Sequence, residues 1–323
     1  PTSRCSSAAS DVYKRQYLEV PHVLATTNGT LPLQIAIKAM DLSGEIITSP
    51  CSYVATASSI VWEGCTPKFV DIHTEYLTID ETKIESAITP NTSAILATHV
   101  FGNPCHVKAI SEIAKKYDLK VIYDAAHCFG VKYNNTSVFN YGDVSTCSFH
   151  ATKIFHTGEG GAIFTKDKSL YDTLFYHHNF GHDGPERFHG LGINAKMSEL
   201  QAAMGLAVFP NMPNIFSARK AVVETYNERL NDMCLKRMKI REHTDWNYCY
   251  YPIIVESEAL LLKLKETLAS NDIHTRRYFY PSLDTLPFLN SEICKNSRDI
   301  APRILCLPLY VGLTNGELEK IIT

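Results

Sequence analysis

Short β-rich runs alternate with amphipathic helical segments from Tyr17 to about Asn211. Strands separated by helices of this length are joined by right-handed crossovers, and such crossovers build a largely parallel sheet. The expected strands are Glu45–Thr48, Lys68–Ile72, Ala94–Val100, Lys120–Tyr123, Val144–Phe149 and Gly161–Thr165, and the expected helices are Thr30–Met40, Ala55–Trp62, Thr82–Ile88 and Val107–Tyr117. This pattern predicts an α/β fold with a mostly parallel central sheet and flanking helices.

The pattern of helices and strands changes at about Asn214, where strong glycine punctuation ends, and we expect a smaller C-terminal α/β domain from there on. A chain of 323 residues fits two domains, or one large domain with a subdomain. We place the boundary near Pro213, so that the large domain covers 17–213 and the small domain 214–323. The expected elements of the small domain are helices at Ile215–Leu230 and Glu256–Ser270 and strands at Tyr248–Val255 and near His274–Phe279.

Both ends of the chain look irregular. Residues 1–16 show no periodicity and resemble cloning sequence, so we interpret them as a non-native leader and leave them out of the fold. The last residues, 316–323, stop inside a helical pattern, which indicates that the C-terminal domain is truncated.

Composition excludes several classes of protein. Thirty-one basic and thirty-four acidic side chains give a formal charge of −3, so nothing indicates nucleic-acid binding. No apolar run approaches the roughly 20 residues that cross a bilayer, and we expect no membrane insertion. The ten cysteines are scattered without a C-x-x-C pair, and no signal peptide precedes them. Free thiols in a reducing cytosol are therefore expected.

An acid at the end of an apolar strand is followed, further along the chain, by a hydroxyl and a lysine. Asp124 ends the first strand, Ser148 lies in the next, and Lys153 follows on a turn. Pyridoxal phosphate requires an amine for a Schiff base, a carboxylate that keeps its ring nitrogen protonated, and small donors around its phosphate. Ligands of open α/β sheets bind beyond the carboxyl ends of the strands. The combination predicts this cofactor, with Lys153 as the catalytic amine and general base.

Each of these residues also has an ordinary structural interpretation. Alone, Asp124 would be read as a helix cap and Lys153 as a surface lysine, but a glycine-rich turn at 157–161 favours close approach to a ligand. Gly29 and Thr30 open a helix whose free amides suit a phosphate, and Ser148 would add a hydroxyl. Tyr53 is placed either to stack on the pyridine ring or to fill the core.

The histidines raise the question of a metal. None belongs to an H-E-x-x-H motif, and no acid stands at ligand spacing from them, so we expect no metal site. The histidines in question are His150, His156, His177, His178, His182 and His189.

Three motifs resemble the DegT/DnrJ/EryC1/StrS family of sugar aminotransferases, which are fold-type-I pyridoxal phosphate enzymes. They are YDAAHCFG (Tyr123–Gly130), SFHATKIFHTGEGGA (Ser148–Ala162) and GINAKMSELQAAMG (Gly192–Gly205), and the likeness runs from about Tyr17 to Thr323.

The resemblance implies a role for each matching residue. It implies Lys153 for the Schiff base, Asp124 for the pyridine nitrogen, His127 for the phenolic oxygen, Tyr53 for ring stacking, Gly29, Thr30 and Ser148 for the phosphate, and Asn194 for the phosphate of a neighbouring subunit. The last role implies a homodimer with shared active sites. Lys196 departs from the family, which more often has Arg there, and Lys cannot copy a bidentate contact. The segment that family members carry upstream of Thr27 is also replaced here.

Within the family, the motifs look most like enzymes that aminate C4 of a dTDP-4-keto-6-deoxyhexose, with L-glutamate as donor, for surface polysaccharides such as O-antigen. Three alternatives remain open. A 3-aminotransferase of a dTDP-3-keto-6-deoxyhexose would keep the same catalytic residues, and a non-catalytic relative would bind the cofactor or sugar only. A dehydratase on this fold would have His in place of Lys153. The sequence also leaves open whether Arg276, Arg277 and Tyr278 hold the sugar or only pack the small domain.

Overall fold

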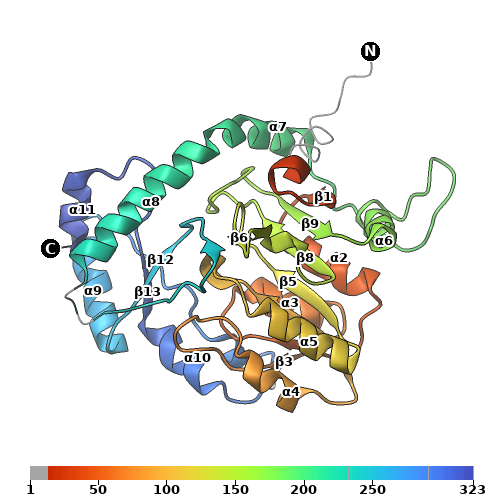
Figure 1. Ribbon diagram of the computed structural model, residues 1–323, viewed down its shortest axis with the longest axis horizontal. Helices are drawn as coiled ribbons and strands as arrows, with labels where there is room; N and C mark the ends of the chain where they lie inside the picture. Colours follow the sequence, from red (N-terminus) through yellow and green to blue (C-terminus); the bar gives the residue numbers. More distant parts are fainter. Residues whose placement is uncertain (1–13, 232, 234, 290, 323) are drawn as a thin grey trace.

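A seven-stranded sheet forms the centre of the molecule, in the order β1-β9-β8-β5-β4-β2-β3 (Figure 1). The computed structural model describes residues 14–231, 233, 235–289 and 291–322. The strands of this sheet are β1 (His22–Thr26), β2 (Glu45–Thr48), β3 (Thr66–Phe69), β4 (Thr92–Thr98), β5 (Lys120–Asp124), β8 (Val144–Ser148) and β9 (Gly161–Thr165).

The sheet is mostly parallel, which confirms the predicted fold class. Strands β3, β2, β4, β5 and β8 are joined by parallel ladders. Only β9 runs against its neighbours, and it pairs antiparallel with both β8 and β1. The parallel strands therefore end at one edge of the sheet, where Thr98, Asp124 and Ser148 are the last residues of β4, β5 and β8.

Helices cover both faces of this sheet because successive strand residues point to opposite sides. The helices of this part are α2 (Leu31–Ala39), α3 (Val54–Trp62), α4 (Ile84–Ala87), α5 (Val107–Tyr117), α6 (Lys168–His178) and α7 (Glu199–Val208). Ile46 and Ile122 belong to the core cluster that contains residues of α2 and α6. Their neighbours Ile47 and Val121 belong to another cluster, which contains residues of α5.

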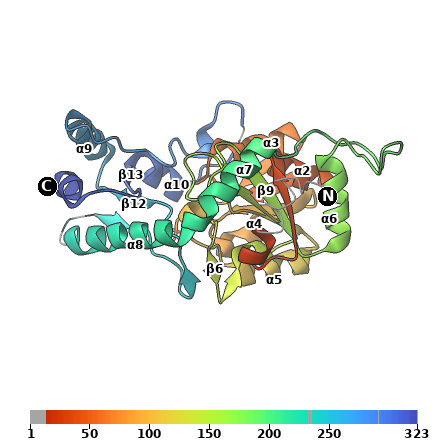
Figure 2. The same ribbon diagram turned by 90° about the horizontal axis from the view of Figure 1, so that it is seen from above.

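A second, smaller sheet in the order β10-β12-β13 builds the C-terminal part, which confirms the expected smaller α/β unit. Its elements are α8 (Met212–Arg229), β10 (Lys236–Arg237), β12 (Tyr251–Ile254), α9 (Glu258–Ser270), α10 (Lys295–Ile300), β13 (Ile304–Leu307) and α11 (Asn315–Ile322). In Figures 1 and 2 the long helix α8 runs from the edge of the large part to the far side of the small one. The predicted boundary near Pro213 falls in the first turn of this helix.

The strand expected near His274–Phe279 was wrong. This segment makes a single antiparallel bridge, between Arg276 and Cys306, instead of a ladder. The side chain of Phe279 is instead buried against the ring of His127.

Short elements complete the chain. They are β6 (Lys132–Tyr133), β7 (Thr136–Ser137), β11 (Thr244–Asp245), and the 3-10 helices η1 (Glu81–Lys83), η2 (Val100–Gly102), η3 (Val138–Asn140), η4 (Phe209–Asn211), η5 (Leu283–Thr285) and η6 (Ala301–Arg303). The segment between α6 and α7 projects from the body as a long loop in both ribbon views.

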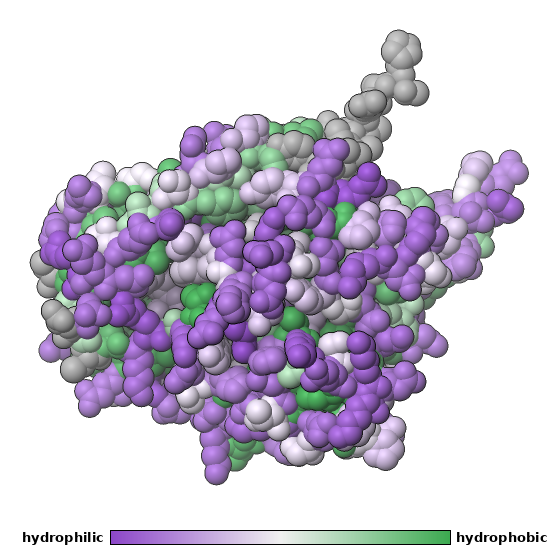
Figure 3. All heavy atoms as spheres, in the orientation of Figure 1, coloured by the Kyte–Doolittle hydropathy of each residue, from purple (hydrophilic) through white to green (hydrophobic). Residues whose placement is uncertain are grey.

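Polar side chains cover most of the face seen in Figure 3, with apolar patches along the upper edge, where α7 and α8 lie. Among the described residues, no helix combines the length and apolar character that a membrane crossing needs.

The expected leader, 1–16, lies mostly outside the described residues, which begin at Lys14. Residues 14–17 form one helical turn. Lys14 is buried, with Nζ 5.0 Å from the centroid of the Phe149 ring, and Tyr17 stacks on Phe129.

Candidate active site

A cavity of about 290 Å³ lies at the edge of the sheet where the parallel strands end. Thr98, Asp124 and Ser148 line it from the ends of three strands, and residues 28–30 approach it from the turn after β1. The cavity brings together the predicted residues Gly29, Thr30, Tyr53, Asp124, His127, Ser148 and Lys153. Asn194 is the one predicted residue that does not line it.

Asp124 is a buried carboxylate that the protein holds by hydrogen bonds. The Thr56 hydroxyl donates to Oδ2 at 2.6 Å, and the Ala126 N–H donates to Oδ1 at 3.1 Å. Burial raises the pKa of Asp124, whereas these two hydrogen bonds and the nearby Lys153 lower it. A cationic group in the cavity would therefore stabilise the charged carboxylate further.

Lys153 lies on the turn after β8, where its N–H donates to the His150 carbonyl at 2.8 Å. Its Nζ stands 6.0 Å from the centroid of the Tyr250 ring. Burial lowers the pKa of Lys153, and the charge of Asp124 opposes that shift. A lowered pKa increases the fraction of neutral amine, which is the nucleophilic and basic form. Lys153 and Asp124 line the same cavity.

His127 is held as a neutral ring with a defined tautomer. Its Nδ1 accepts from the Phe101 N–H at 3.0 Å, which places the ring proton on Nε2. The ring stacks on Phe279 at 5.6 Å and on Phe101 at 6.1 Å. Burial, and then the Lys153 charge, hold the pKa of His127 well below 6.5. The Nε2–H is the group left to donate to a ligand in the cavity.

The turn at residues 28–30 approaches Ser148 so closely that only glycine fits. A Cβ on Gly29 would lie 2.6 Å from Ser148 Cβ and 2.7 Å from Ser148 Oγ. Asn28 Oδ1 accepts from the N–H groups of Thr30 and Leu31, both at 2.9 Å, so two of the helix amides expected for a phosphate are already paired. The Thr30 and Ser148 hydroxyls remain as phosphate donors at this end of the cavity.

Tyr53 and Asn194 lie in different surroundings. Tyr53 precedes α3, lines the cavity and is 60% exposed. Asn194 bridges to Asn179, and its Oδ1 accepts from Lys196 Nζ at 3.0 Å. Within one chain, Asn194 therefore does not reach the cavity.

Sequence reasoning missed Thr56 and left open the roles of Arg276, Arg277 and Tyr278. Thr56 binds Asp124 from the first turn of α3, and its place three residues after Tyr53 on one helix was the available signal. Arg276 and Tyr278 line the cavity, whereas Arg277 donates to Glu258 at 2.6 Å outside it.

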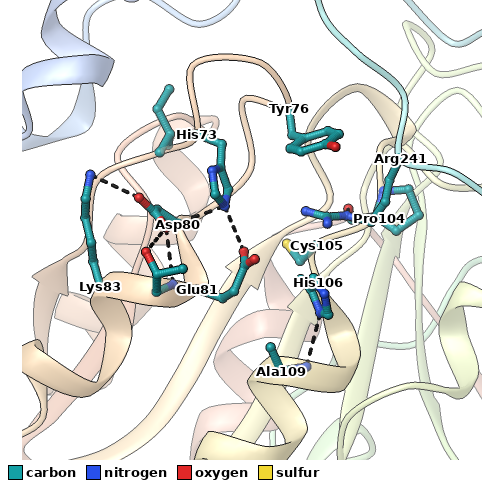
Figure 4. Close-up of polar contacts among 12 residues, drawn as sticks. His73, Tyr76, Asp80, Glu81, Lys83, Pro104, Cys105, His106, Ala109 and Arg241 are labelled. Atoms are coloured by element: carbon teal, nitrogen blue, oxygen red, sulfur yellow. Dashed lines mark hydrogen bonds and ion pairs between the residues drawn. The ribbon is translucent and has the colours of Figure 1, made fainter.

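Figure 4 shows a separate polar cluster in which His73, Asp80 and Glu81 are close enough to share a metal ion. These are the three ligand-type side chains that the described residues bring together in this way. His73 Nε2 already contacts Glu81 Oε2 at 2.9 Å, and Lys83 Nζ contacts Asp80 Oδ2 at 3.0 Å. Asp80 also accepts from Thr82 as the N-cap of η1. These contacts account for the cluster without an ion, and none of its members lines the cavity.

Comparison with known proteins shows a likeness over nearly the whole chain. Residues 13–323 match the profile of the DegT/DnrJ/EryC1/StrS aminotransferase family. A dTDP-4-amino-4,6-dideoxy-D-glucose transaminase of Shigella dysenteriae is 42% identical over 95% of this chain and 86% of the relative. A transaminase of the same name from Escherichia coli is 36% identical over 95% and 85%. The crystal structure of DesI in the presence of its TDP-sugar product superposes with a TM-score of 0.92 at 30% identity, over 98% of this chain and 83% of that one.

Proposed function

Because this chain belongs to the DegT/DnrJ/EryC1/StrS aminotransferase family, we propose that it transfers an amino group from L-glutamate to C4 of a dTDP-linked 4-keto-6-deoxyhexose. The observation that carries the proposal is a half-buried Lys153, with a lowered pKa, that lines the same cavity as the buried carboxylate of Asp124. The choice of sugar is supported by the 42% identity to the Shigella transaminase. We also propose that the amino sugar serves surface polysaccharide, such as O-antigen.

The residues present fit pyridoxal phosphate. The close approach of Gly29 to Ser148 leaves a cradle that a Cβ would fill, with two hydroxyls beside it, and a carboxylate stands opposite on Asp124. When bound, this cofactor supplies the carbonyl that accepts an amino group and a ring that takes up electrons from the substrate carbon. Asp124 would hold the proton on the ring nitrogen, and His127 Nε2–H would donate to the phenolic oxygen. Tyr53 would cover the ring from the α3 side.

Lys153 moves the proton in both halves of the reaction. As a neutral amine, its Nζ can remove the proton from Cα of the amino donor, and as an ammonium it can return a proton to C4 of the sugar. The lowered pKa of Lys153 suits the first task, because it increases the fraction of neutral amine, and the charge of Asp124 supports the second, because it favours the ammonium form. The charge of Asp124 limits the lowering of the Lys153 pKa and so keeps the ammonium form of Lys153 accessible.

A second candidate, amination of C3 of a 3-keto sugar, would use the same residues. The names of the two relatives favour C4. Incubating the protein with glutamate and candidate keto-sugars, and identifying the aminated carbon by NMR, decides between them. A non-catalytic relative would form no 2-oxoglutarate from glutamate at all.

We propose a homodimer with shared sites and a cytoplasmic location. Phe188, Leu191 and Leu200 expose large apolar side chains on the loop and helix that flank Asn194, as a contact with a second copy would require. All described cysteines are free and buried, as expected in a reducing compartment.

The first prediction concerns the reactive amine. Lys153→Ala should lower turnover by about 10⁴-fold or more, because it removes both the nucleophile and the base. Turnover is measured as glutamate-dependent 2-oxoglutarate formation, with circular dichroism to verify folding. Lys166→Ala, at an exposed lysine after β9, is the control and should keep wild-type rates. Wild-type turnover in Lys153→Ala would refute the assignment.

A further inference from the structure

A side cavity adjoins the active site behind Lys153. It has a volume of about 170 Å³ and shares Thr152 and Arg276 with the main cavity. Arg219, Tyr250 and His274 also line it, together with the residues at and after the end of β13, Leu307–Leu309. Lys153 lines the main cavity, and its Nζ lies 6.0 Å from the ring centroid of Tyr250, so the reactive amine is close to the side cavity.

The lining of the side cavity is cationic. Its basic side chains are Arg219, His274 and Arg276, and no Asp or Glu of the described residues lines it. The Arg219 guanidinium is fixed by three backbone carbonyls, those of Tyr248, Leu309 and Cys249. Because carbonyls carry no net charge, its positive charge remains uncompensated at this wall.

Arg276 has no carboxylate partner among the described residues. Its Nη1 donates to the Tyr278 hydroxyl at 3.0 Å, which leaves most of its N–H groups for a ligand. The adjacent Arg277 differs, since its Nη2 contacts Glu258 at 2.6 Å and its guanidinium stacks 3.7 Å from the Tyr280 ring centroid. Arg276 therefore faces the cavities, whereas Arg277 packs against the rest of the small domain.

The Tyr250 hydroxyl supplies an independent indication of a ligand. It is buried and has no hydrogen-bond partner among the described residues. Burial raises the pKa of Tyr250, and so do the Cys249 and Cys306 thiols, whereas Arg219 lowers it; all three neighbours line the side cavity. The Tyr250 hydroxyl therefore remains protonated and is a hydrogen-bond donor. An unpaired buried donor is unfavourable, and a bound acceptor would satisfy it.

We propose that the side cavity is an oxyanion subsite for a reactant, in which Arg276 and the Tyr250 hydroxyl donate and Arg219 supplies fixed charge. This rests on the proposed function, since both of its substrates carry such a group. The distal carboxylate of the amino donor and the diphosphate of the nucleotide sugar share this chemistry. Anchoring either one here would fix the distance between the anion and the atom that meets Lys153, and would reject reactants without that anion.

The experiment measures binding of two unreactive probes to the cofactor-loaded protein by calorimetry. Glutarate represents the dicarboxylate donor, and dTDP represents the nucleotide. Tyr250→Phe removes only the hydroxyl and keeps the ring beside Lys153, and Arg276→Gln removes the charge. We expect each variant to weaken the Kd of one probe about tenfold, which identifies the source of the anion. Arg277→Gln is the matched control and should bind both probes as the wild type does.

The proposal is overturned if the wild type binds neither probe, or if both variants bind both probes with wild-type Kd. Loss of affinity for both probes supports a subsite that the two reactants share. Formation of 2-oxoglutarate from glutamate by the wild type is measured separately and reports on the proposed function. A wild type that forms none would refute that function, whereas the probe affinities would still decide whether the subsite exists.

Discussion

At the scale of single residues, burial acts in opposite directions on the ionisable groups of the cavity. It raises the pKa of Asp124 and lowers those of Lys153 and His127, so in each case it favours the neutral form. For Asp124, hydrogen bonds from Thr56 and Ala126 and the charge of Lys153 lower the pKa again and favour the charged form. For His127, no acidic side chain is among the groups that shift its pKa. The site thus contains one carboxylate, Asp124, that can bind a cationic group, and one imidazole, His127, that stays neutral.

Two buried neutral histidines should make the fold sensitive to acid. Burial, and then the Arg241 charge, lower the pKa of His99 to about 3, and the pKa of His127 is also far below 6.5. Below about pH 6.5 the unfolded chain takes up protons that the folded chain refuses, so stability is present above that pH and is lost as pH falls. Each histidine contributes a slope of up to about 1.4 kcal/mol per pH unit.

His127→Gln tests this sign, because glutamine can still accept from the Phe101 N–H but does not titrate. The free energy of urea unfolding, measured between pH 7.5 and 5, should fall less steeply in the variant than in the wild type. Asp124 has a raised pKa and works in the other direction, but it is present in both proteins and cancels in the comparison. The exposed His189→Gln should keep the wild-type slope. Equal slopes for wild type and His127→Gln would contradict the buried neutral histidine.

Single residues also show which parts of the site a sequence can reveal. Asp124, Ser148 and Lys153 were predictable because strand ends and a glycine-rich turn have local signatures. Thr56 contacts Asp124 across a separation of 68 residues, and the only local signal for that contact is its place three residues after Tyr53. Tyr250 was missed for a similar reason, since its distinctive property is a missing partner, which only the packed structure can show.

At the scale of elements, several predictions match the structure residue for residue. Strands β2 and β9 and helix α5 have the predicted bounds. The segment expected as a strand near His274–Phe279 lies beside β13, whose other edge pairs with β12, but it makes only one bridge to β13. Arg276, Tyr278 and Phe279 of this segment line the cavity instead.

The start of α2 carries a prediction about capping and cofactor binding together. Asn28 Oδ1 accepts two backbone hydrogen bonds at the helix start, so Asn28→Ala should cost about 1 kcal/mol of unfolding free energy. Asn28→Asp keeps the acceptor and should keep that stability, while its charge at the cavity should weaken binding of the cofactor phosphate about tenfold. Urea unfolding and cofactor titration measure the two effects. If both variants lose stability equally, the cap is not the source of the loss.

At the scale of the whole molecule, the cavity depends on contacts between distant parts of the chain. Phe101 and Val100 from the large part share a core cluster with Ile254, Phe279 and Ile304 from the C-terminal part. Two members of this cluster, Phe101 and Phe279, stack on the ring of His127. The sequence predicted both parts, but it could not predict this junction, because its members have ordinary apolar neighbours along the chain.

The proposed dimer has a consequence that a single chain cannot show. Asn194 lies outside its own cavity, and Lys153 lies within it. If the two residues meet across a two-fold axis, each site takes Lys153 from one subunit and Asn194 from the other. Asn194→Asp can still accept from Lys196 and should fold, but its charge should repel the phosphate of the cofactor in the partner.

Lys153→Ala and Asn194→Asp should therefore each be inactive alone and partly active together. After the two proteins are unfolded, mixed in equal amounts and refolded, half of the dimers are hybrids, and one of the two sites in each hybrid combines an intact Lys153 with an intact Asn194. About one site in four should then turn over, measured as 2-oxoglutarate formation. If instead Asn194 serves its own chain, every site in the mixture carries at least one defect and no activity returns. Full activity of Asn194→Asp alone would refute shared sites directly, because it would show that the residue does not approach any phosphate.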